Sequence, residues 1–97
     1  MKNAIVLDPS DNVATVITTV ETGDIVALKG IDGAITAATP VAFGHKIALS
    51  AIRAGACIVK YGQKIGKATC DIPPGSWIHL HNMASALDAD FRKRICR

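Results

Sequence analysis

One short motif recurs along this chain and limits the length of any strand or helix it can form. An aliphatic residue, two spacers and a glycine lead into an apolar segment as VETG at residues 20–23, IRAG at 52–55 and IPPG at 72–75. Glycine supplies the positive φ that such turns often require. The intervals between the motifs are too irregular for a solenoid repeat. The chain is therefore predicted to form a barrel-like or clip-like β fold that turns sharply several times.

Short apolar segments between turn clusters predict a mainly β protein. Pro73 and Pro74 exclude a central strand at that point. The segment 34–38 should return antiparallel to 25–28 across a glycine-containing loop. From Ala84 the composition favours a helix, so we expect one β domain over residues 1–82 and a C-terminal helical tail or linker over 83–97. The expected strands cover residues 5–7, 13–17, 25–28, 34–38, 47–49, 58–61, 65–69 and 77–81.

Size and composition favour one domain that works as part of an assembly. The 97 residues are 49% hydrophobic and only 4% aromatic, so the core must be aliphatic. This apolar content exceeds what so small a body needs, which predicts a surface covered by a partner chain or by further copies in a homo-oligomer.

Charge and hydropathy argue against two classes of partner. Much of the net charge of +3 lies close to the C-terminus, where cations complement the end of a helix. No basic face with interleaved aromatic residues is evident, so nucleic acid is not an expected partner. No apolar segment is long enough to span a membrane. The absence of a signal-peptide pattern, with three cysteines that lack CxxC spacing, predicts a cytoplasmic location.

The polar residues with catalytic potential fall in three short segments. All three histidines belong to this set, together with two lysines and the only tyrosine of the chain. Lysines supply charge and imidazoles donate, accept or titrate near neutrality, so the set suits an anionic, oxygen-rich ligand. The chain has one glutamate and neither a carboxylate pair nor a serine–histidine pairing, so we expect another chain to complete the site. The segments are Gly44-His45-Lys46, Lys60-Tyr61-Gly62 and His79-Leu80-His81-Asn82.

In a strand over 77–81, alternation would place Trp77, His79 and His81 on one face. Positions two apart lie ~6.6 Å from each other, so both imidazoles could contact one ligand or one metal. Two imidazoles are fewer than the three or four ligands of a zinc site. Three interpretations remain open: a metal held by this chain, histidines in a site shared with another chain, and surface histidines that pack beside Trp77.

The order of these motifs resembles the SAF domain of the altronate/galactarate dehydratase family. The similarity covers about residues 11–82. It implies a β-clip fold and a small subunit that acts with a large catalytic subunit. That subunit would carry most of the active site and a divalent metal, iron or manganese. A related small subunit belongs to sulfolactate sulfo-lyase. The matching segments begin at Asp11, Gly44, Ile58, Ile65 and His79.

The resemblance also implies a reaction, namely loss of water from an anionic sugar acid to give a 2-keto-3-deoxy sugar acid. Residues 83–87 lack the threonine expected of hexarate enzymes, which leaves the substrate undetermined. Sulfolactate cleavage, a non-catalytic carbohydrate-binding or regulatory module, and an assembly role are the alternatives. The implied catalytic residues are His79, His81 and Lys60. The implied substrate-binding residues are His45, Lys46, Tyr61, Asn82, Gly44 and Gly62.

Overall fold

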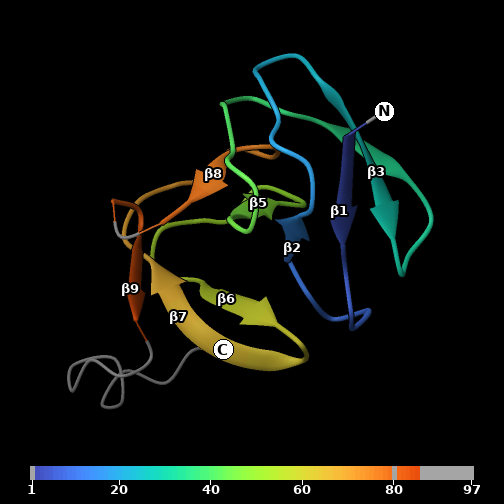
Figure 1. Ribbon diagram of the computed structural model, residues 1–97. Helices are drawn as coiled ribbons and strands as arrows, with labels where there is room; N and C mark the ends of the chain where they lie inside the picture. The colour runs from blue at the N-terminus through green and yellow to red at the C-terminus, as the bar shows by residue number, and fades with distance from the viewer. Residues whose placement is uncertain (1, 80, 86–97) are drawn as a thin grey trace.

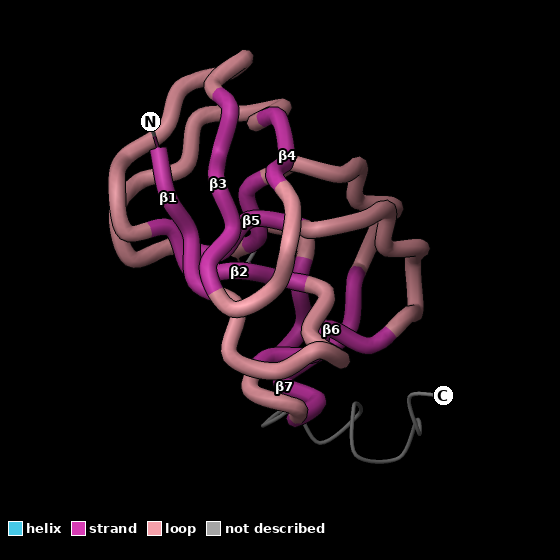
Figure 2. The backbone as a smooth tube through the Cα atoms, turned by 90° about the vertical axis from the view of Figure 1, so that its right-hand side faces the viewer, coloured by secondary structure: helices cyan, strands magenta, loops and turns pink. Residues whose placement is uncertain are grey.

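The computed structural model describes residues 2–79 and 81–85, which form nine short strands in two sheets (Figure 1). The strands are β1 (Lys2–Ile5), β2 (Val13–Val16), β3 (Ile25–Lys29), β4 (Ala34–Thr36), β5 (Lys46–Ala48), β6 (Cys57–Lys60), β7 (Gln63–Ala68), β8 (Trp77–Ile78) and β9 (Met83–Ser85). The described chain consists of strands and loops, as Figure 2 shows, so the prediction of a mainly β fold is confirmed. No helix in this part of the chain is long and apolar enough to cross a membrane.

The larger sheet has the order β4-β3-β1-β2-β5-β8, and the smaller one the order β6-β7-β9. β1 and β3 run parallel, whereas the other paired strands are antiparallel. The predicted return of the chain after β3 is confirmed, because β4 pairs antiparallel with it. β8 is an edge strand of the larger sheet.

The recurring glycine motif builds four turns of the same kind. The three predicted motifs have glycines with φ of 90°, 86° and 80°, and a fourth motif at residues 41–44 ends in Gly44 with φ 85°. In each turn the N–H after the glycine donates to the carbonyl three residues earlier. Glycine with positive φ at the third turn position is typical of type II turns.

The aliphatic residues that open these motifs pair with one another. Val20 forms an isolated bridge with Val41, and Ile52 with Ile72. The first pair belongs to one buried apolar cluster and the second pair to another. β5 contributes to both clusters, because successive side chains of a strand point to opposite faces. This strand, at the boundary between the two clusters, carries the candidate residue Lys46, and His45 directly precedes it.

The C-terminal end of the domain differs from the prediction. Met83–Ser85 form β9 paired with β7, so the sheet extends beyond residue 82 and the expected helix does not begin at residues 83–85. Gly66 makes this pairing feasible, because a β-carbon at that position would overlap the Ala84 carbonyl oxygen. The rest of the predicted helical tail, 86–97, lies outside the described residues.

Candidate functional site

The pairing of β5 with β8 determines which side chains meet at the site. Lys46 lies opposite Ile78 and Ile47 opposite Trp77. Continuing this register by one step sets His45 opposite His79. Because side chains alternate along a strand, His45, Trp77 and His79 start from one face of the pair, and Lys46 starts from the other.

All three histidines surround Trp77. The ring of His79 stacks on the indole with centroids 5.2 Å apart, and the ring of His81 lies tilted at 5.0 Å. His45 meets the indole edge at 5.6 Å, and the His45 and His79 rings are 5.4 Å apart. We call Trp77, His45, His79 and His81 the imidazole cluster.

One polar contact ties this cluster together. The indole Nε1–H of Trp77 donates to Nδ1 of His45 over 3.1 Å. The Trp77 backbone is held on both sides, since its N–H donates to the Thr39 hydroxyl at 2.9 Å and its carbonyl accepts from the Asn82 amide at 2.9 Å. The position of the indole is therefore set by the sheet and by Asn82.

The prediction of a five-residue strand at 77–81 is wrong in its length, but the imidazole cluster forms without it. β8 ends at Ile78, and a turn follows in which the Asn82 N–H donates to the His79 carbonyl. The Asn82 side-chain oxygen accepts from the His79 N–H over 3.0 Å. This turn brings His81 back onto the indole. Asn82 is only 6% exposed and its amide is engaged at both ends, so in this structure it supports the turn.

The two candidate lysines form a separate cationic region. Lys46 is half-buried, and desolvation, followed by the charge of Lys60, lowers the pKa of its ammonium group. Lys60 Nζ lies 4.6 Å from the centre of the Tyr61 ring. We call Lys46, Lys60 and Tyr61 the lysine region. Thr15, the register partner of Lys46, has a buried hydroxyl without a hydrogen-bond partner among the described residues.

Tyr61 and Gly62 occupy the tip of the β6–β7 hairpin. Both have positive φ, 56° and 72°, as a two-residue type I′ turn requires. The Asp11 carboxylate holds this tip by accepting from both N–H groups at 3.0 and 2.8 Å. Tyr61 remains 53% exposed. Tyr61 therefore presents an exposed aromatic ring from a left-handed backbone conformation, which is uncommon for residues other than glycine.

The structure brings the candidate residues together as two groups. Within residues 2–79 and 81–85, no hydrogen bond or ring contact links the imidazole cluster with the lysine region. Gly44 shapes the turn that delivers His45 to the first group.

The imidazole cluster does not fit a metal site of its own. In the described part of the chain no three His, Cys, Asp or Glu side chains converge as metal ligands. The His45 nitrogen that faces the cluster is also occupied by the indole N–H. If His79 and His81 bind a metal, the described residues therefore offer no third ligand for it.

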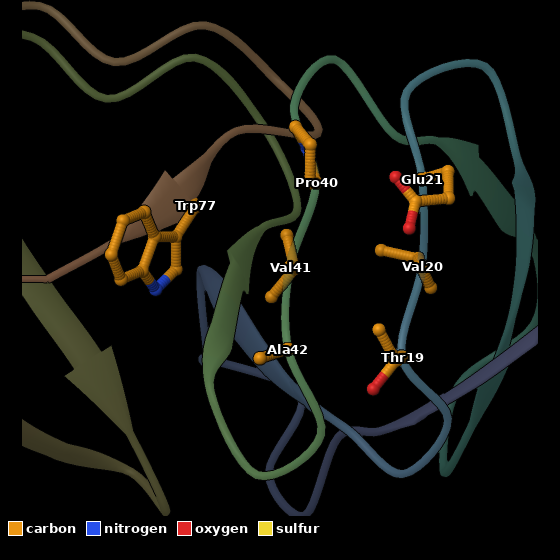
Figure 3. A pocket seen from close by; sticks show the side chains of 7 residues that line it. All are labelled: Thr19, Val20, Glu21, Pro40, Val41, Ala42 and Trp77. Atoms are coloured by element: carbon orange, nitrogen blue, oxygen red, sulfur yellow. The ribbon is translucent and has the colours of Figure 1, made fainter.

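Trp77 is a member of the site whose functional role was not predicted from the sequence. It also forms one wall of an apolar pocket of about 240 Å³, shown in Figure 3. Its signal was present in the sequence, since it is the only tryptophan and precedes two alternating histidines. The other lining residues are Thr19, Val20, Glu21, Pro40, Val41 and Ala42.

Comparison with known proteins identifies a family whose domain matches this chain. Residues 2–86 match the altronate/galactarate dehydratase SAF domain. The chain is 37% identical over 87 residues to altronate dehydratase of Bacillus subtilis, and 39% identical over 77 residues to altronate dehydratase of Escherichia coli. These matches cover 90% and 79% of the chain but only 17% and 15% of the two dehydratases.

A third relative is much shorter. The chain is 38% identical over 58 residues to (2R)-sulfolactate sulfo-lyase subunit alpha of Paracoccus pantotrophus. This match covers 60% of the chain and 87% of that subunit. Similar domains therefore occur within long proteins and as a subunit of nearly domain size.

Proposed function

This chain belongs to the family of altronate/galactarate dehydratase SAF domains, and on that premise we propose that it is the small subunit of a sugar-acid dehydratase. It acts with a separate large catalytic chain to remove water from an altronate- or galactarate-type acid. The product is a 2-keto-3-deoxy sugar acid. The location we propose is the cytoplasm.

The observation that carries this proposal is the gathering of His45, His79 and His81 around one indole. Elimination of water next to a carboxylate needs a base, an acid for the departing hydroxyl, and stabilisation of the enolate-like charge. Imidazoles suit the first two tasks because they exchange protons near neutrality. We assign proton transfer to His79 and His81, whose side chains are both exposed.

The lysine region supports an anionic substrate. Lys46 and Lys60 lie close enough for the charge of one to lower the pKa of the other. A carboxylate bound near both would relieve this repulsion. We propose that these lysines neutralise the substrate carboxylate, with Lys60 next to the reacting centre, and that Tyr61 and Gly62 contact its hydroxyl groups. Because Lys46 starts from the other face of the β5–β8 pair, the large chain must help to join the two regions.

The divalent metal of such an enzyme, iron or manganese, is proposed to be held by the large chain. It would stabilise negative charge on the substrate carboxylate. Among the described residues of this chain, no three His, Cys, Asp or Glu side chains converge to hold it. No step that we assign to His79, His81 or Lys60 passes through the metal.

A second candidate function is sulfolactate cleavage with release of sulfite. The observation that favours it is the match to 87% of the sulfo-lyase subunit alpha, whereas the dehydratases are matched over a small fraction of their length. A third, a non-catalytic carbohydrate-binding or regulatory module, is favoured by the pocket beside Trp77.

Reconstitution separates these functions. The chain should be co-purified with a large dehydratase-like chain encoded beside it, and the pair assayed for 2-keto acid with altronate or galactarate and for sulfite with sulfolactate. We expect 2-keto acid from the pair and not from either chain alone. Sulfite release would establish the second function. Full activity of the large chain alone at saturating substrate would establish the third.

A further inference from the structure

The hydrogen bond between Trp77 and His45 determines which nitrogen of His45 carries a proton. An indole nitrogen can only donate, so Nδ1 of His45, 3.1 Å away, must be the acceptor. A neutral imidazole has a single N–H. With Nδ1 as acceptor, that proton resides on Nε2.

We propose that Trp77 is a positioning residue that holds His45 in its Nε2–H form. The indole is suited to this role because Thr39 and Asn82 fix its backbone on both sides. A proton on Nδ1 would set two donors against each other. His45 therefore offers an N–H donor to an oxygen of the ligand and does not serve as a base.

The other two imidazoles are different. Among the described residues, no ring nitrogen of His79 or His81 takes part in a hydrogen bond, although both rings contact the indole. Both nitrogens of each ring remain available for proton exchange. The structure thus divides the imidazole cluster into one fixed donor and two rings that can transfer protons. The assignment of the donor to a substrate oxygen rests on the proposed function, but the tautomer of His45 does not.

The tautomer can be measured directly on the whole chain. Long-range ¹H–¹⁵N NMR correlations of the three imidazoles distinguish Nδ1–H from Nε2–H forms. We expect His45 to be in the Nε2–H form at neutral pH. In Trp77→Phe, which keeps an aromatic ring but lacks the N–H, a substantial Nδ1–H population should appear. Phe43→Leu, which removes an exposed aromatic side chain near His45 in sequence, should leave the tautomer unchanged.

A His45 ring in the Nδ1–H form in the wild-type chain would overturn the proposal, even if Trp77→Phe failed to fold. An unchanged tautomer in a folded Trp77→Phe chain would overturn it as well.

A kinetic measurement on the reconstituted pair tests the donor role. Loss of one oriented donor should raise KM about tenfold in Trp77→Phe and change kcat by less than about threefold. A fall in kcat with KM unchanged would overturn the donor assignment. If the pair has no lyase activity while His45 is in the Nε2–H form, the proposed function fails and the positioning role of Trp77 stands.

Discussion

His45 and His79 lie opposite each other at the end of the β5–β8 ladder, with ring centroids 5.4 Å apart. Backbone pairing rather than a mobile loop sets this distance. Two residues well separated in sequence therefore form one side of a site whose geometry exists before any ligand binds. Preorganisation of this kind lowers the entropic cost of orienting a substrate. His81 joins them through the turn that Asn82 closes.

Replacement of His81 tests the proton-transfer assignment. In the reconstituted pair, His81→Ala should lower turnover by about 10²-fold or more, the effect expected of a general acid or base. Steady-state kinetics with the sugar acid provides the measurement. Asp32→Asn, in the exposed loop between β3 and β4, is the control and should leave turnover unchanged. Turnover within about threefold of wild type would remove His81 from the mechanism.

Replacement of Asn82 tests its supporting role in the turn. Asn82→Ala removes two hydrogen bonds and leaves the His79 N–H and the Trp77 carbonyl without these partners. We expect the free energy of unfolding to fall by about 2–3 kcal/mol, measured by urea denaturation. Ser10→Ala, which removes an exposed hydroxyl bonded to Asp8, should change it by less than about 0.5 kcal/mol. An equally small effect in Asn82→Ala would show that the turn forms without this side chain.

The lowered pKa of Lys46 predicts how stability depends on pH. Desolvation, and then the charge of Lys60, lowers this pKa below its ordinary value of 10.5. Between the lowered and the ordinary value the unfolded chain binds more protons than the folded chain, so the free energy of unfolding rises with pH. Below this window the charged ammonium disfavours the folded state in full.

Lys46→Met should therefore raise the free energy of unfolding at neutral pH, and this gain should shrink as the pH rises through the window. Urea denaturation at a series of pH values from neutral to alkaline measures both effects. Lys29→Met, at an exposed position of β3, is the matched control and should show no such gain. A stability difference between Lys46→Met and wild type that stays constant with pH would contradict the assignment.

Much of the fold could be predicted from local patterns. The recurring glycine motif and the short apolar segments between turn clusters predicted the main turns and the approximate positions of most strands. The gathering of Trp77, His79 and His81 was also predicted, because alternation and the actual turn bring the same side chains together.

Features that depend on long-range pairing could not be predicted. The meeting of His45 with His79 requires the register of β5 on β8, which no local pattern specifies. The residues from Ala84 onward favour a helix by composition. Met83–Ser85 instead pair with β7, where Gly66 has no side chain to block the Ala84 carbonyl oxygen. Tertiary pairing overrides local propensity at such positions.

Two glycines of the same motif should respond differently to alanine. Gly55 and Gly75 both have positive φ, 86° and 80°, so a β-carbon is unfavourable at each by about 1 kcal/mol. At Gly55 it would meet no other atom within 4 Å, whereas at Gly75 it would overlap the Thr36 carbonyl oxygen. Gly75→Ala should therefore destabilise the chain by about 3 kcal/mol in thermal or urea unfolding, and Gly55→Ala by about 1 kcal/mol. Equal losses of stability in the two variants would show that the close approach of Gly75 to the Thr36 carbonyl oxygen does not constrain this position.

The conformation of Tyr61 predicts a conflict between stability and binding. Its φ of 56° is costly for tyrosine but well tolerated by asparagine, the residue favoured in type I′ turns. Tyr61→Asn and Tyr61→Ala both remove the ring beside Lys60, but only asparagine relieves the backbone. We expect the Asn variant to be more stable than the Ala variant by about 1 kcal/mol in urea denaturation. Both variants should raise KM for the sugar acid in the reconstituted pair. If the Asn variant bound substrate as well as wild type, the strained tyrosine would have no role in the site.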